Sequence, residues 1–148
     1  VRSSAASDVY KRQPLVDGLD FACNCGKTGC LDAYCAAGLL SGPYGGSLEA
    51  FFSALDRGES AAVSLWDVYA PCLAAAANNL HMAFDCTVIL GGYVGAFLTP
   101  YMDSLRALAA SLDTFGGGGS YLQPCRCRGE ASAVGAALLY IEPFMQSI

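Results

Sequence analysis

The 148-residue chain carries little charge, since only 14% of its residues are Asp, Glu, Lys or Arg. Basic residues are the scarcer kind, with 8 Lys and Arg against 13 Asp and Glu, so the formal net charge is −5. A net-acidic surface repels phosphate backbones, which argues against a nucleic-acid interface on this segment. Because 54% of the residues are apolar, the composition also excludes intrinsic disorder. It predicts a globular domain with a substantial core.

Long apolar runs are also missing. The two longest charge-free stretches, 68–84 and 86–102, are 17 residues each and are interrupted by proline together with asparagine or glycine. A membrane-spanning helix needs about 20 predominantly apolar residues, so we expect no membrane span. The N-terminal residues contain no apolar central run of a secretory signal. We therefore expect a soluble protein.

Residues 1–13 differ from the rest of the chain. They read VRSSAASDVYKRQ, hold three of the eight basic residues and show no sustained helix or strand period. The string resembles sequencing-adapter DNA read as protein at the ends of metagenomic translations. We therefore expect a non-native leader at 1–13. The native segment would be 14–148, truncated at its N-terminus.

Eight cysteines need an explanation. One explanation is four disulfide bonds, but dense disulfides are typical of short secreted chains that cannot build a core. The spacing is uneven: three cysteines lie within 23–30, two lie at 125 and 127, and three stand alone. Clustering at short spacing favours metal binding over disulfides and indicates a reducing, cytoplasmic compartment.

The densest cluster is the segment CNCGKTGC. Cys23, Cys25 and Cys30 lie within eight residues, and Gly26 and Gly29 permit the tight turns that would let three thiolates converge. Soft thiolates at this density suit tetrahedral zinc, although a structural zinc takes four ligands. The alternative is three reduced cysteines in a surface loop.

The remaining pattern is helix-dominated. Helices are expected at 30–37, 48–55, 60–84, 93–112 and 130–146, and strands at 86–90 and 121–127. Ser47 and Ser60 are candidate N-caps, and Pro71 is a candidate kink. The apolar run CTVIL is typical of a buried strand, whereas Cys125 and Cys127 alternate with arginines as in a half-buried strand. Aromatic residues at helical spacings are expected in the core: Phe51, Phe52, Trp66, Phe97 and Tyr101.

The cysteine motif carries a family resemblance. CNCGKTGCLDAYC resembles the C-x-C-G-x-x-G-C-[LI]-E signature of the ROK family of repressors, open reading frames and sugar kinases. TVILGG at 87–92 is similar to the family's strand and glycine turn, and GEASAVGAALL at 129–139 resembles its C-terminal helix. The resemblance covers about 14–148. It implies the C-terminal lobe of an actin-like (ribonuclease-H-like) sugar-kinase ATPase fold, α/β and helix-rich, with a zinc-binding loop.

The resemblance implies ligands residue by residue. It places zinc on Cys23, Cys25 and Cys30, with the family's fourth ligand a histidine in an upstream segment that this sequence lacks. The only histidine, His81, does not match that position, and we expect an ordinary helix residue. Asp32 matches the family's acidic sugar contact and is one methylene shorter than the usual Glu. Its alternative role is a first-turn carboxylate that favours the helix dipole.

The glycine turn implies a second contact. Gly91 and Gly92 match residues that approach the nucleotide in the kinases, where a Cβ would block a close ligand. The alternative is a plain strand-to-helix turn. The third residue, often glycine in kinases, is Tyr93, whose ring would narrow or fill the adenine cleft. No second metal site is expected at Cys125 and Cys127.

The family comprises sugar kinases and sugar-sensing repressors, so the resemblance leaves two functions open. Tyr93 and Asp32 favour a sugar-responsive transcriptional regulator that binds a sugar or sugar phosphate, forms a homodimer and contacts DNA through a missing N-terminal domain. The alternative is an ATP- and Mg-dependent hexose or N-acetylhexosamine kinase, similar to glucokinase. Its catalytic residues would lie upstream, so we expect no catalytic residue and no activity in this fragment. A stand-alone zinc-binding interaction module is a third hypothesis, which requires a fourth ligand.

Overall fold

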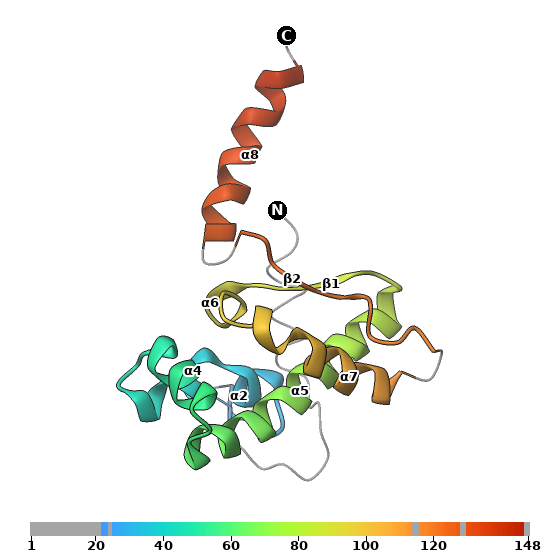
Figure 1. Ribbon diagram of the computed structural model, residues 1–148. Helices are drawn as coiled ribbons and strands as arrows, with labels where there is room; N and C mark the ends of the chain where they lie inside the picture. The colour runs from blue at the N-terminus through green and yellow to red at the C-terminus, as the bar shows by residue number, and fades with distance from the viewer. Residues whose placement is uncertain (1–21, 24, 114–115, 128–129, 147–148) are drawn as a thin grey trace.

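A computed structural model describes residues 22, 23, 25–113, 116–127 and 130–146 (Figure 1). The expected leader at 1–13 lies outside the described residues. The N-terminal half contains helices α2 (Leu31–Cys35), α3 (Ala37–Ser41), η1 (Gly42–Tyr44), α4 (Leu48–Asp56) and α5 (Ser60–Phe84). The C-terminal half contains β1 (Val88–Leu90), α6 (Gly92–Gly95), η2 (Thr99–Tyr101), α7 (Met102–Leu112), β2 (Leu122–Pro124) and α8 (Ala131–Gln146).

Helix α5 is the centre of the molecule, because α2, α4 and α7 all pack against it (Figure 1). Its small buried residues, such as Ala70, Ala74 and Ala77, let the neighbouring helices approach closely. The expected helix over 60–84 is confirmed, and it continues through Pro71. The N-cap is Glu59 rather than Ser60, which is the first helical residue.

An aromatic cluster joins α4 to α5 and to the segment between α6 and α7. The Phe52 ring stacks on Phe97 with centroids 5.0 Å apart, and the Trp66 ring lies 5.0 Å from that of Tyr101. Phe51 meets Phe52 edge-on at 5.1 Å. The expectation that these five aromatic residues form core is confirmed, since all belong to one buried cluster or pack against it.

Two predicted helices are broken in the structure. The helix predicted at 30–37 is the pair α2 and α3, because Ala36 is extended (φ −68°, ψ 138°), and Gly38 lies inside α3. The helix predicted at 93–112 is divided into α6, η2 and α7. Pro100 lies at the start of η2, where its missing N–H leaves no bond unmade, and this favours a new helical start there. The Ser47 cap of α4 is confirmed, since the Ala50 N–H donates to Ser47 Oγ at 3.1 Å.

Strands β1 and β2 form a parallel pair in which Val88 lies opposite Leu122 and Leu90 opposite Pro124. Both strands are shorter than predicted. The first is buried on one face only, because Ile89 is 64% exposed. The second ends at Pro124, so Cys125 and Cys127 lie beyond the strand and not within it. One hydrogen bond to β1 follows Pro124, because the N–H of Cys125 donates to the carbonyl oxygen of Leu90 at 2.9 Å.

Helix α8 projects away from the other helices (Figure 1). Among the α8 residues whose burial is described, the large exposed apolar side chains are Val134, Leu138, Leu139, Ile141 and Met145. Of the described helices, α5 alone is long and apolar enough to cross a membrane, with a marginal mean hydropathy of 1.2. The core helix of a soluble protein meets the same criterion, and α2, α3, α4 and α7 all pack against α5.

Candidate functional site

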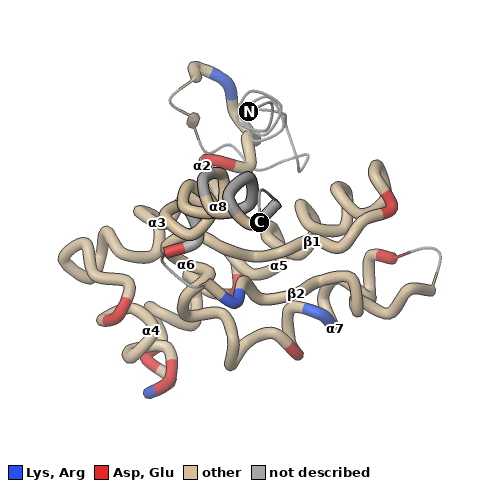
Figure 2. Tube along the Cα trace, turned by 90° about the horizontal axis from the view of Figure 1, so that it is seen from above, with Lys and Arg blue, Asp and Glu red and all other residues tan. Residues whose placement is uncertain are grey.

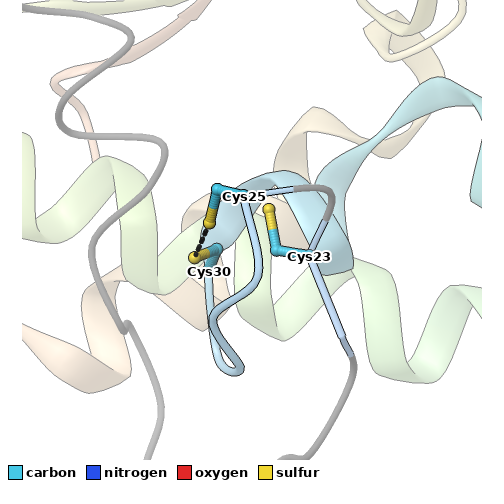
Figure 3. Close-up of side chains that lie close together, drawn as sticks. All are labelled: Cys23, Cys25 and Cys30. Atoms are coloured by element: carbon cyan, nitrogen blue, oxygen red, sulfur yellow. Dashed lines mark hydrogen bonds between the residues drawn. The ribbon is translucent and has the colours of Figure 1, made fainter.

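The cysteine loop brings three sulfur atoms together just before α2 (Figure 3). The Sγ atoms of Cys23, Cys25 and Cys30 all lie within 4.8 Å of one another, and those of Cys25 and Cys30 are 3.6 Å apart. Gly26 and Gly29 adopt φ values of 82° and 76°, a left-handed conformation that other residues adopt at a cost. The two glycines therefore make the tight turns that the spacing predicted.

These distances fit a tetrahedral metal. Zinc–sulfur bonds of about 2.3 Å at tetrahedral angles separate the sulfurs by about 3.8 Å. Among the described residues no fourth His, Cys, Asp or Glu joins the group, so the three thiolates supply three of the four ligands of a tetrahedral metal. Cys30 is buried, whereas Cys25 is exposed. A metal held here is therefore closed off on the Cys30 side.

The protonation of the thiols differs across the group. A hydrogen bond from the Lys27 backbone is the main cause that lowers the pKa of Cys25 and favours its thiolate. Burial raises the pKa of Cys30 to about 11. A zinc ion binds the thiolate form, so binding at neutral pH would release the Cys30 proton.

A pocket of about 440 Å³ lies beside this loop, a volume within the range of small-molecule sites. Asp32, in the first turn of α2, lines one wall. Gly91 and Tyr93, which follow β1, line another. The structure therefore brings the predicted sugar contact and part of the predicted glycine turn to one pocket. Gly92 is not among the residues that line it.

The glycine turn has different requirements at its successive positions. Gly92 has a φ of +73°, so its backbone conformation favours glycine. A Cβ at Gly91 would lie 3.4 Å from the Cβ of Cys125, which is an ordinary contact. A Cβ at Gly95 would lie only 2.9 Å from the carbonyl oxygen of Leu90, so the close packing of α6 on β1 requires glycine there.

Sequence reasoning missed the α5 side of the pocket. Tyr69 and Leu73 line it, and the Tyr69 hydroxyl donates to the carbonyl oxygen of Cys35 at 3.1 Å. Burial raises the pKa values of both Tyr69 and the Cys35 thiol, so neither ionises near neutral pH. The helical spacing of Tyr69 indicates only a core position, because one sequence does not show which buried aromatic borders a pocket.

The other candidate side chains lie elsewhere. His81 is in the last turn of α5, where its ring stacks on Tyr121 with centroids 3.9 Å apart. Its Nδ1 lies 2.9 Å from the carbonyl oxygen of Cys86. No described His, Cys, Asp or Glu forms a metal-binding group with Cys125 and Cys127.

The comparisons with known proteins agree with the resemblance carried by the cysteine motif. The family model described as "ROK family" matches residues 15–142, which is most of the chain. No curated protein and no solved structure matches it. The match extends from upstream of the cysteine loop through the glycine turn and most of α8, and the family implies an actin-like sugar-kinase fold. The chain therefore belongs to the ROK family.

Proposed function

We propose that residues 14–148 are the C-terminal lobe of a sugar-responsive transcriptional regulator, in which a zinc loop holds the sugar-binding carboxylate in place. The observation that carries this proposal is the position of Asp32. It follows the last cysteine of the loop by two residues and lines a pocket of ligand size. The parent would be a cytoplasmic homodimer that contacts DNA through an N-terminal domain.

Zinc would act here by fixing the start of α2. Cys30 is the N-cap of that helix, and no side-chain hydrogen bond caps it. A helix of five residues is too short to be stable without tertiary contacts. A metal bound to Cys23, Cys25 and Cys30 would tie the loop to the first turn and so orient Asp32 toward the pocket.

Tyr93 supports the regulator over the kinase. Its side chain is 80% exposed and lines the same pocket as Asp32. A tyrosine at the third position of the glycine turn, where kinases often have glycine, would narrow the adenine cleft of a kinase, whereas a regulator needs no nucleotide there.

The alternative, an ATP-dependent hexose or N-acetylhexosamine kinase, is favoured by the backbone of the glycine turn. Gly92, two residues after the end of the parallel strand β1, has a left-handed φ, and a glycine at this position suits close approach of a nucleotide. A stand-alone zinc module has less support, because the described residues offer no fourth ligand.

A phosphotransfer assay tests the enzyme alternative at the level of this chain. Incubation with ATP, Mg²⁺ and a panel of hexoses and N-acetylhexosamines should yield no sugar phosphate above a protein-free blank. Reproducible turnover would contradict the proposal and favour the kinase.

The coding sequence upstream of Pro14 gives the second test. A winged helix there supports the regulator, whereas an Asp-x-Gly-x-Thr phosphate motif without one supports the kinase.

A further inference from the structure

Two of the three sulfur atoms in the cysteine loop are placed to react with each other. The Sγ atoms of Cys25 and Cys30 face one another at 3.6 Å (Figure 3). A disulfide bond is about 2.05 Å long, so the two atoms need to approach by only about 1.5 Å. The chain between them turns at two left-handed glycines, Gly26 and Gly29. The loop can therefore form this bond through a small movement of the segment 25–30.

The two cysteines differ in their access to solvent. Residues 25–28 are exposed, whereas Gly29 and Cys30 are buried. The loop lies at the edge of the molecule beside the start of α2 (Figure 2). Cysteines that sense oxidants are exposed and often lie next to a second cysteine, which resolves the first oxidised product. Cys25 suits the first role and Cys30 suits the second.

We propose that the cysteine loop is a redox switch, in which hydrogen peroxide converts Cys25 and Cys30 to a disulfide and the loop releases its zinc. The Cys25 sulfur attacks one peroxide oxygen, the O–O bond breaks, and a sulfenic acid and one water form. The Cys30 sulfur then attacks the Cys25 sulfur, the S–O bond breaks, and the oxygen leaves as a second water. Overall the two thiols lose two electrons and two protons, and the peroxide is reduced to two waters.

Cys23 is the remaining thiol of the loop. It lies within 4.8 Å of the other two sulfurs, but a single residue separates it from Cys25. So short a connection leaves the backbone little freedom to adopt the specific torsion of a disulfide. Zinc binds thiolates, and oxidation of Cys25 and Cys30 leaves the loop only one. The bound metal is therefore lost when this pair is oxidised.

The switch rests on the zinc loop of the proposed function and needs neither its sugar nor its DNA. Disulfides in cytoplasmic proteins are usually transient and serve catalysis or redox sensing, which suits a bond that forms only on exposure to an oxidant. A dithiol reductant should break the bond by thiol–disulfide exchange and restore the site for zinc.

The first measurement is zinc release from the zinc-loaded full chain. Hydrogen peroxide should release most of the metal to a chromogenic chelator, and the chain should lose two alkylatable thiols. Dithiothreitol followed by fresh zinc should restore both the thiols and the metal content.

Peptide mapping then identifies the bond. Trypsin cleaves after Lys27 and chymotrypsin after Tyr34, so the two enzymes place Cys25, Cys30 and Cys35 on three different peptides. A disulfide between Cys25 and Cys30 joins the peptide that ends at Lys27 to the one that begins with Thr28. A disulfide between Cys23 and Cys25 would instead stay within one peptide.

Serine variants assign the two partners. The cross-linked peptides should disappear in Cys25→Ser and in Cys30→Ser, and they should persist in Cys23→Ser. Cys127→Ser is the matched control, because Cys127 is also exposed but lies outside the loop. It should keep both the cross-link and the zinc release of the parent. Circular dichroism checks that each variant retains its helices.

The outcomes separate the switch from the proposed function. Zinc that stays bound after peroxide treatment would overturn the switch and leave the zinc loop in place. A cross-link between any other pair of cysteines, or one that persists in Cys25→Ser, would also overturn it. A purified chain that binds no zinc would remove the zinc loop of the proposed function together with the switch.

Discussion

At the scale of single residues, the cysteine loop gives the sharpest expectation. Cys25→Ser replaces a thiolate by a hydroxyl that stays protonated at neutral pH, so the variant should lose most of its bound zinc. Cys127→Ser is the control, because Cys127 is also exposed but lies beyond β2, outside the cysteine loop. Elemental analysis of the purified proteins measures the difference. Equal zinc loss in both variants would refute the ligand assignment.

Tyr69 gives a residue-level expectation for stability. Its hydroxyl donates to the Cys35 carbonyl and ties α5 to the end of α2. Tyr69→Phe removes the donor and leaves that carbonyl without this bond, so the free energy of unfolding should fall by about 1–2 kcal/mol. Urea unfolding followed by circular dichroism measures it. Tyr93→Phe, which alters an exposed hydroxyl, should change the unfolding free energy by less than about 0.5 kcal/mol.

At the scale of elements, the turn between α7 and β2 depends on one close approach. A Cβ on Gly119 would clash with the carbonyl oxygen of Arg106, and the residue also has a φ of +72°. Gly119→Ala should therefore destabilise the chain by more than about 2 kcal/mol. Gly118→Ala is the matched control, because it has a similar φ of +66° with nothing within 4 Å. Thermal melting should show a smaller loss of stability for Gly118→Ala than for Gly119→Ala, and the difference measures the cost of the clash with the Arg106 carbonyl. Equal losses of stability in the two variants would contradict this account.

Elements also show where sequence reasoning succeeds. Ser47 could be identified as a cap because its oxygen satisfies a donor three residues away, which is a local interaction. The breaks at Ala36 and before Pro100 were missed because helical periodicity continues across both segments. Cys23, Cys25 and Cys30 could be grouped from spacing alone. That Asp32 and Tyr93 line one pocket could not be predicted from spacing, because it depends on how α2 and α6 pack beside α5.

At the scale of the whole molecule, α8 exposes apolar surface that water solvates poorly. Leu139 is 67% exposed, and neighbouring apolar side chains on the helix are exposed as well. Such a surface favours self-association. Sedimentation velocity should therefore show species whose size increases with protein concentration.

The contribution of α8 to association can be separated from that of other apolar positions. Replacing both Leu138 and Leu139 by Asp should shift the sedimenting species toward the monomer. Phe84→Asp, at an exposed position on α5, should shift it less. A monomer at all concentrations in the parent chain would contradict the expectation.

The parallel pairing of β1 with β2 also constrains the order of folding. Parallel neighbours cannot be joined by a tight hairpin, and here the connection 91–121 includes α6, η2 and α7. Bringing its ends together costs chain entropy before any strand hydrogen bond forms. The docking of α7 on α5 buries Leu105 and Ala109, and the free energy of this burial offsets part of the entropic cost. We therefore expect the sheet, and with it the glycine turn beside the pocket, to assemble after the helices and to open before them when the chain unfolds.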